Sequence, residues 1–263
     1  MVDVIEKGPS RESQKPPLLF VHGAYHGAWC WDEHFLDFFA AKGYRSLAVT
    51  LRGHSKNPAP KPMRSCSIAD WVDDVASVAD SLPTRPLLVG HSVGGFVVQK
   101  YLESHEAPAA VLLAPAPTSG ITKFFLRRFK LHPWLTASTL AMGKTLRAVG
   151  GTPELARESF FSDSTPDADV ARYAAQLVEE YVSRFVLDML FLDLPKPNLV
   201  TTPLLVLGAE NDILFTQREI RATAAAYHTE AEIFPEMAHN MMLEPGWAAV
   251  AKRIHAWLEQ LMP

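Results

Sequence analysis

The chain has 263 residues, of which 48% are hydrophobic and 21% are charged, as is typical of a globular protein. This length suffices for one large domain or two small ones. A formal net charge of −4 and an isoelectric point near 6.2 give no general attraction to nucleic acid or to an anionic membrane. No apolar run is long enough to span a bilayer. We therefore expect neither nucleic-acid binding nor stable membrane insertion.

The N-terminal segment and the two cysteines indicate the compartment. No apolar segment follows a basic start at the N-terminus, so we expect no signal peptide. Cys30 and Cys66 lie in neither a metal-ligand nor a C-x-x-C spacing, and we interpret them as reduced thiols. These features predict a cytoplasmic protein without metal or cofactor.

Short apolar runs alternate with helical patterns along most of the chain. Strands are predicted at residues 18–21, 45–50, 87–90, 109–113, 204–207 and 231–234, with an edge strand at 2–5. Helices are predicted at residues 28–41, 68–81, 216–227 and 247–260, and another directly after the strand at 87–90. Such alternation is typical of a mostly parallel sheet covered by helices on both faces, so we predict an α/β fold.

The alternation stops between residues 118 and 202. This segment is rich in Phe, Leu, Met and Trp and shows helical patterns without a convincing strand. We predict a core domain of residues 1–117 and 203–263, with residues 118–202 inserted as a helical cap. The cap is expected over the C-terminal edge of the sheet, where open α/β sheets bind ligands.

Two groups of cap residues have alternative interpretations. Residues 123–130 interleave aromatic with basic side chains. They form either an entry lip for lipid surfaces or anionic substrates, or a helix with a buried aromatic face and a solvated basic face. The other group either builds the core of the cap or in part lines an apolar acyl pocket: Phe160, Phe161, Tyr173, Tyr181, Phe185, Met189 and Phe191.

Residues 90–94 read Gly-His-Ser-Val-Gly, between an apolar run and a helix-compatible run. A serine hydroxyl is a poor nucleophile unless a tight turn holds it clear of the backbone, beside a base. Gly90 and Gly94 allow strand and helix to approach closely at such a turn. We predict that Ser92 is a nucleophile, and the alternative is a structural turn.

An acid and a base follow two later strands. Asp212 comes after the strand at 204–207, and His239 comes after the strand at 231–234. Because parallel strands end at the same edge of a sheet, both loops should face Ser92. We predict that His239 takes the serine proton and that Asp212 orients the imidazole, with Glu210 as the nearest competitor. His54-Ser55 lacks the second glycine and is interpreted as a noncatalytic loop near the site.

Ser92, Asp212 and His239 in this chain order, with His22-Gly23 after an early strand, resemble the α/β-hydrolase fold superfamily. The resemblance implies an oxyanion hole made of the backbone N–H groups of Ala24 and Val93. A serine at position 92 argues against the dehalogenases and most epoxide hydrolases of this superfamily, which use aspartate there.

Two further stretches refine the resemblance. Residues 22–31, His-Gly-Ala-Tyr-His-Gly-Ala-Trp-Cys-Trp, are similar to a subgroup of plant methyl esterases and hydroxynitrile lyases. Residues 51–55, Leu-Arg-Gly-His-Ser, look like general bacterial hydrolases instead.

We therefore predict a serine hydrolase that cleaves a small-to-medium apolar carboxylic ester through an acyl-enzyme. An alternative is a cofactor-free perhydrolase, haloperoxidase-like or hydroxynitrile-lyase-like enzyme with the same three residues. A noncatalytic ligand-binding receptor is a third hypothesis, which the intact Ser–His–Asp set disfavours. The expected partner is a small-molecule ester, and a homodimer is left open. The expected pocket residues are His22, Gly23, Tyr25, His91 and Met241.

Overall fold

Seven strands form one sheet in the computed structural model, which describes residues 2–9, 15–54, 65–146 and 149–262. The strand order is β1-β3-β2-β4-β5-β6-β7. β1 runs antiparallel to β3, and the other five pairings are parallel. The strands are β1 Asp3–Lys7, β2 Leu18–Val21, β3 Ser46–Thr50, β4 Leu87–His91, β5 Ala110–Leu113, β6 Leu204–Ala209 and β7 Ala231–Phe234.

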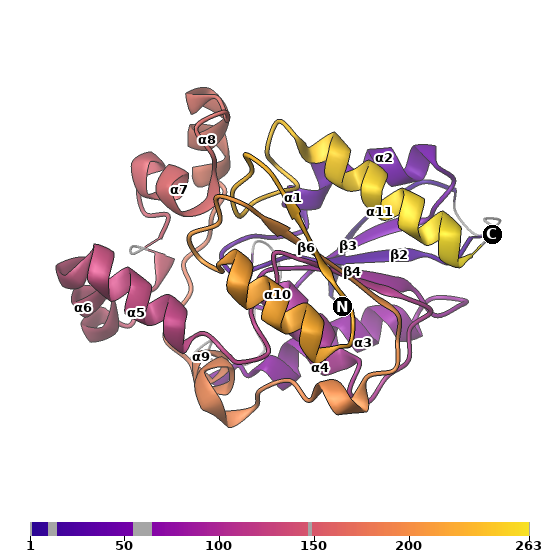
Figure 1. Ribbon diagram of the computed structural model, residues 1–263, viewed down its shortest axis with the longest axis horizontal. Coiled ribbons are helices and arrows are strands. Elements are labelled where there is room, and N and C mark those ends of the chain that lie inside the picture. Colours follow the sequence, from indigo (N-terminus) through magenta and orange to yellow (C-terminus); the bar gives the residue numbers. More distant parts are fainter. Residues whose placement is uncertain (1, 10–14, 55–64, 147–148, 263) are drawn as a thin grey trace.

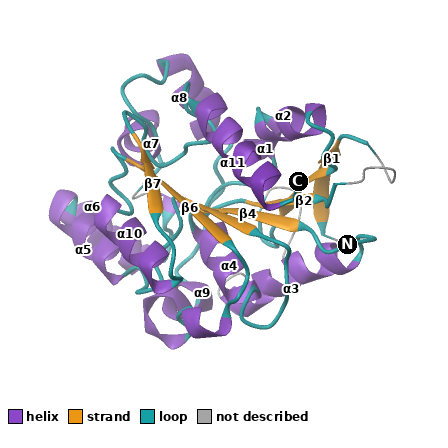
Figure 2. Cartoon of the chain, turned by 45° about the vertical axis from the view of Figure 1, so that its right-hand side comes forward, coloured by secondary structure: helices purple, strands orange, loops and turns teal. Residues whose placement is uncertain are grey.

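Helices cover both faces of this sheet. One face carries α1, α2 and α11, and the other carries α3, α4 and α10 (Figure 1, Figure 2). Their bounds are α1 Trp29–Asp32, α2 Phe35–Ala41, α3 Ile68–Asp80, α4 Val93–Tyr101, α10 Gln217–Ala226 and α11 Trp247–Leu261. The predicted α/β architecture is therefore confirmed.

The core lies on both sides of the central strands. Every residue of β2, β4 and β5 is buried, because helices exclude water from both faces of a parallel sheet. On one face, Phe20 of β2 contacts the rings of Trp31, Phe35 and Phe39 at centroid distances of 5.0, 6.2 and 5.7 Å. Aromatic pairs in these tilted and edge-on arrangements stabilise a core beyond their buried area.

The prediction of one continuous helix at residues 28–41 is wrong, because two short helices, α1 and α2, occupy this stretch. The chain leaves helical geometry at His34, where φ is −145° and ψ is −47°. The His34 ring stacks on Trp247 of α11, with centroids 4.5 Å apart and planes at 3°. This partner lies more than 200 residues away, so the local periodicity does not contain the break.

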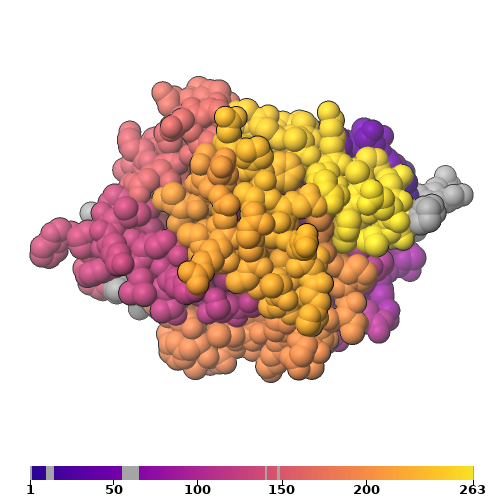
Figure 3. All heavy atoms as spheres, viewed as in Figure 1, coloured from indigo at the N-terminus to yellow at the C-terminus, as the bar shows by residue number. Residues whose placement is uncertain are grey.

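Between β5 and β6 the described residues form helices and one isolated bridge, Lys144 to Tyr181. We call residues 118–202 the cap segment, and its division from the core stays a prediction. In the view of Figure 3 the segment forms the left-hand part of the surface and continues along its lower edge. Its helices are α5 Thr122–Leu131, α6 Pro133–Met142, α7 Pro153–Phe160, α8 Asp167–Ala174, α9 Arg184–Leu187, η3 Asp188–Leu192 and η4 Pro197–Leu199. No helix in the described residues is both long and apolar enough to cross a membrane.

Gly94, in the first turn of α4, brings that helix directly against the end of β2. A Cβ at Gly94 would lie 2.4 Å from the carbonyl oxygens of both Val21 and His22. These contacts are with backbone rather than with a flexible side chain, so neither neighbour can move aside alone. The close approach places the first turn of α4 beside the loop that follows β2.

We expect Gly94→Ala to lower the free energy of unfolding by about 1–3 kcal/mol, the usual cost of overpacking. Urea denaturation followed by circular dichroism measures this change. Gly246→Ala is the matched control, because its Cβ would meet only the Met237 side chain at 3.4 Å. Equal stability of the two variants would contradict the prediction.

Candidate active site

Ser92 occupies the turn between β4 and α4. Its backbone has φ 55° and ψ −121°, a left-handed conformation that is costly for a residue with a Cβ. Gly23 makes room beside it, since a Cβ there would lie 2.8 Å from the Cβ of Ser92. The turn therefore holds the serine side chain at the C-terminal edge of the sheet, at the N-terminus of α4.

The structure brings the three predicted polar side chains into one hydrogen-bonded row. The Ser92 hydroxyl lies 2.8 Å from Nε2 of His239, and Nδ1 of His239 lies 2.7 Å from Oδ2 of Asp212. Asp212 follows β6 and His239 follows β7, which are neighbouring parallel strands. All three residues are buried. In this arrangement the imidazole can accept a proton from the hydroxyl while the carboxylate accepts the other ring N–H.

Further hydrogen bonds hold Asp212 and His239 in place. The other oxygen of Asp212, Oδ1, accepts the backbone N–H groups of Leu214 at 2.8 Å and Phe215 at 3.0 Å. Nε2 of His91 lies 3.0 Å from the backbone carbonyl oxygen of His239 and donates to it. The carboxylate of Asp212 and the main chain of His239 are thus both restrained.

The two residues predicted to form an oxyanion hole, Ala24 and Val93, both lie in the pocket wall. Val93 is the first residue of α4, so its N–H has no acceptor within the helix. Ala24 follows Gly23 in the loop after β2, and both Ala24 and Val93 line the same pocket as Ser92. Neither N–H has a hydrogen-bond acceptor among the residues that the structure describes. Both remain available to a substrate oxygen.

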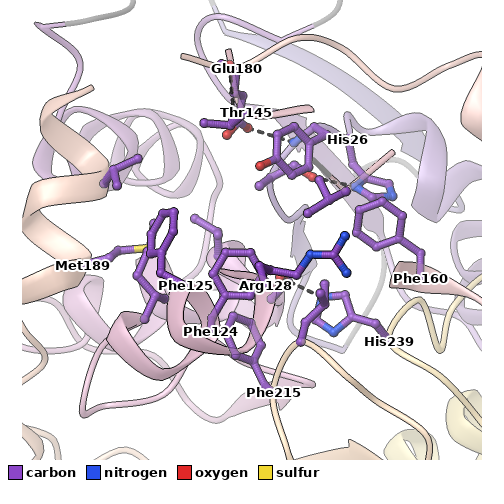
Figure 4. A pocket seen from close by; sticks show the side chains of 18 of the residues that line it. His26, Phe124, Phe125, Arg128, Thr145, Phe160, Glu180, Met189, Phe215 and His239 are labelled. Carbon is purple, nitrogen blue, oxygen red and sulfur yellow. Dashed lines mark hydrogen bonds between the residues drawn. The ribbon is translucent and has the colours of Figure 1, made fainter. Parts of the chain in front are cut away.

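The pocket at Ser92 and His239 has walls from the core and from the cap segment (Figure 4). The empty space within it is about 840 Å³, including its opening to solvent. Its walls are mainly apolar. The large contributors are Phe124, Phe125, Phe160, Phe185, Met189 and Phe215.

The pocket residues expected from sequence fall into two groups. Tyr25 and His91 line the pocket, whereas His22, Gly23 and Met241 are not among the lining residues. His22 instead bridges two loops, because its Nε2 accepts the Leu51 N–H at 3.0 Å and its Nδ1 donates to the carbonyl oxygen of Gly23 at 2.8 Å. Met241 is completely buried.

The aromatic and basic stretch 123–130 lies in α5. It is neither a simple entry lip nor a helix with one buried aromatic face and one solvated basic face. Phe124, Phe125 and Arg128 line the pocket, and Arg128 is 2% exposed and pairs with Glu158 at 3.0 Å. The expectation of a wholly solvated basic face is therefore wrong at Arg128. Of the cap residues with two interpretations, Phe160, Phe185 and Met189 line the pocket.

Sequence reasoning missed several polar residues of the pocket wall, among them His26 and Glu180. Neither has a spacing that distinguishes it from a surface residue. His54 was expected near the site, and its Nε2 lies 2.6 Å from Oε1 of Glu180. Ser55, the other half of that pair, lies outside the described residues. No cluster of His, Cys, Asp or Glu that could hold a metal is found in the described part of the chain.

Three buried histidines near the site are held neutral. Burial lowers the pKa of His26 to about 4, and it lowers the pKa values of His22 and His91 well below their usual range. The unfolded chain therefore holds more protons than the folded protein between about pH 4 and pH 6.5, so stability falls as the pH falls through this window.

We expect the free energy of unfolding to decrease from pH 7 to pH 4.5, with His26 alone contributing about 3 kcal/mol over its full titration. Urea denaturation at a series of pH values measures the slope. In His26→Gln the decrease should be shallower, since one of the three groups no longer titrates. An identical slope in the variant would refute this assignment.

The chain has partial relatives among curated proteins. Probable esterase PIR7A of Oryza sativa subsp. indica is 32% identical over 165 residues, which is 57% of this chain and 61% of the rice protein. A non-heme chloroperoxidase of Streptomyces lividans is 33% identical over 105 residues, 38% of this chain and 37% of that protein. The chain thus spans about three fifths, or less, of the length of these relatives.

Solved structures match over nearly the whole chain. An esterase from Thermogutta terrifontis has a TM-score of 0.75 at 18% identity, covering 100% of this chain and 94% of the esterase. An enol-lactonase from Burkholderia xenovorans has a TM-score of 0.76 at 17% identity, covering 98% and 96%. At such identities the likeness concerns the fold. The model of the alpha/beta hydrolase family matches residues 18–253. The chain therefore belongs to the alpha/beta hydrolase family.

Proposed function

We propose that the protein hydrolyses a carboxylic ester, with Ser92 as nucleophile, His239 as general base and Asp212 as the orienting acid. The observation that carries the proposal is the buried row of side chains, with 2.8 Å between Ser92 and His239 and 2.7 Å between His239 and Asp212. A receptor needs no such row. The two distances allow Nε2 of His239 to accept the serine proton while its Nδ1–H donates to Asp212.

In the acylation step, Oγ of Ser92 attacks the carbonyl carbon of the ester while Nε2 of His239 takes the hydroxyl proton. The resulting tetrahedral intermediate carries its negative charge on the former carbonyl oxygen. Its collapse breaks the bond to the alcohol, which leaves with the proton from His239. The acyl group then remains as an ester on Ser92.

Deacylation repeats these steps with water. His239 takes a proton from water while the water oxygen attacks the acyl carbon. The proton then passes from His239 to Oγ of Ser92 as the carboxylic acid leaves. Asp212 accepts the Nδ1–H throughout and stabilises the imidazolium that forms at each step. Because Asp212 also accepts two backbone N–H groups, it is already oriented before the substrate arrives.

We assign the oxyanion hole to the N–H groups of Ala24 and Val93, which are fixed before the charge develops. One such donor contributes about 3–4 kcal/mol to the stabilisation of a transition state. The apolar wall of the pocket favours a small-to-medium apolar ester. In this proposal residues 118–202 act as a cap that excludes water above the core of residues 1–117 and 203–263.

A second candidate uses the same residues with a different acceptor. The chloroperoxidase of Streptomyces lividans supports a perhydrolase-like or haloperoxidase-like reaction, in which hydrogen peroxide replaces water and releases a peracid. Hydroxynitrile-lyase chemistry is a further alternative within this fold. Peroxide and cyanohydrin assays alongside ester hydrolysis separate these activities.

We expect Ser92→Ala to reduce kcat for p-nitrophenyl butyrate by at least about 10⁴-fold, since nothing else in the row can form the acyl-enzyme. A fluorophosphonate probe should label Ser92 in the wild-type protein, as located by peptide mass spectrometry. Circular dichroism checks that the variant is folded. Full activity in the folded variant, or labelling of another residue, would remove Ser92 as the nucleophile.

We expect Asp212→Asn to lower kcat by about 10⁴-fold because the amide favours the wrong tautomer of His239. Glu210→Gln is the matched control, since the Glu210 carboxylate accepts a backbone N–H from Glu236 and lies outside the row. Its kcat should stay close to that of the wild type. The reverse result would make Glu210 the acid.

A further inference from the structure

A buried carboxylate of the cap segment, Glu180, lies in the wall of the pocket and has no role in the mechanism above. It is 1% exposed and lies between α8 and α9. A buried carboxylate is costly unless hydrogen bonds compensate the loss of water. The partners of Glu180 therefore indicate what holds it there.

Oε1 of Glu180 receives two hydrogen bonds from the core. One comes from the backbone N–H of Tyr25 at 2.8 Å, and the other comes from Nε2 of His54 at 2.6 Å. Tyr25 directly follows Ala24, whose N–H belongs to the proposed oxyanion hole. The carboxylate thus links the cap segment to the next peptide of that loop.

Tyr25 is held by three separate contacts with the cap segment. Besides the bond from its N–H, its carbonyl oxygen accepts the Val178 N–H at 2.9 Å, and its side chain hydrogen-bonds Thr145. Thr145 in turn donates its N–H and its hydroxyl to the carbonyl oxygen of Glu180. Tyr25 has φ 66°, a conformation that a non-glycine residue keeps only when its surroundings impose it.

The opposite end of the same peptide is held by the core. The carbonyl oxygen of Ala24 accepts Nδ1–H of His26 at 2.6 Å. Nε2 of His26 accepts the Asn240 side-chain amide at 3.0 Å, and Asn240 adjoins His239. Because its pKa is lowered to about 4, His26 is neutral near pH 7 and can donate from one nitrogen while accepting at the other.

The peptide between Ala24 and Tyr25 is therefore restrained at its carbonyl oxygen by His26 and at its N–H by Glu180. A peptide is planar, so two such bonds restrict its rotation and, with it, the ψ angle of Ala24. We propose that Glu180 is a positioning residue: by holding the peptide after Ala24, it restrains the backbone that carries the Ala24 N–H and makes the oxyanion hole depend on the docked cap segment. This inference rests on the proposed ester hydrolysis.

Two substitutions of Glu180 separate positioning from packing. Glu180→Leu keeps most of the side-chain volume and removes the acceptor. Glu180→Gln keeps an oxygen at Oε1, where both N–H groups donate, and should restore the restraint. The matched control is Glu179→Leu, because Glu179 accepts the N–H of Leu146 within the cap segment and makes no hydrogen bond to Tyr25.

In Glu180→Leu we expect kcat for p-nitrophenyl butyrate to fall about 10- to 100-fold with KM little changed, because the misplaced donor acts on the transition state. The affinity for a trifluoromethyl ketone, which forms a tetrahedral adduct with an active serine, should fall by a similar factor. Glu180→Gln and Glu179→Leu should stay within about threefold of the wild type in both measurements, as expected when the donors keep their positions.

Wild-type kcat in folded Glu180→Leu, or a change in KM alone, would overturn the inference while leaving Ser92-dependent hydrolysis intact. Absence of Ser92-dependent hydrolysis in the wild type would overturn the proposed function together with the inference. If Glu180→Leu does not fold, Thr145→Val decides, since it keeps the side-chain volume and removes the hydroxyl that bonds both the Glu180 carbonyl oxygen and the Tyr25 side chain. It should lower kcat severalfold at constant KM, and an unchanged kcat would count against positioning.

Discussion

The close contact between α4 and the end of β2 is the constraint on which the site depends. Ser92 keeps a left-handed backbone because glycines on both sides allow strand, loop and helix to meet at backbone distance. A Cβ at Gly90 would collide with the carbonyl oxygen of Gly94 and with the Val98 side chain, and a Cβ at Gly94 would collide with main-chain carbonyl oxygens. The strain at one residue is thus maintained by the packing of the elements around it, which also places Val93, the first residue of α4, in the pocket wall.

Around this turn, loops from separate strands supply complementary groups. β6 leads to the carboxylate, β7 leads to the imidazole, and the loop after β2 brings a second N–H group. Burial strengthens each hydrogen bond in this network, and it also makes every unpaired polar group costly. The site therefore depends on the sheet edge and on the cap segment together. The hydrogen bond from the Tyr25 N–H to Glu180 joins the two, next to the groups proposed to act with Ser92.

The order of strands and helices in the core could be predicted because each element repeats a local pattern. Buried strands appear in the sequence as continuous apolar runs. Parallel strands end at the same edge of the sheet, so the loops that carry Ser92, Asp212 and His239 meet there. The break at His34 could not be predicted, since it depends on a ring stack with Trp247. The burial of Arg128 could not be predicted either. A basic residue next to aromatic residues shows the same local pattern whether its side chain pairs with Glu158 or is solvated by water.

By itself, the sequence determined the parallel core and the three residues that meet at its edge, because strand spacing and the Gly-His-Ser-Val-Gly turn are local signals. Only the tertiary structure decided which cap residues form the pocket wall and which loops they hold. Glu180 is one acidic residue among 29 in the chain, and nothing near it in sequence identifies Tyr25 and His54 as its partners. Contacts between residues so far apart arise from the packing of the cap segment on the sheet. Local periodicity in the sequence does not predict this packing.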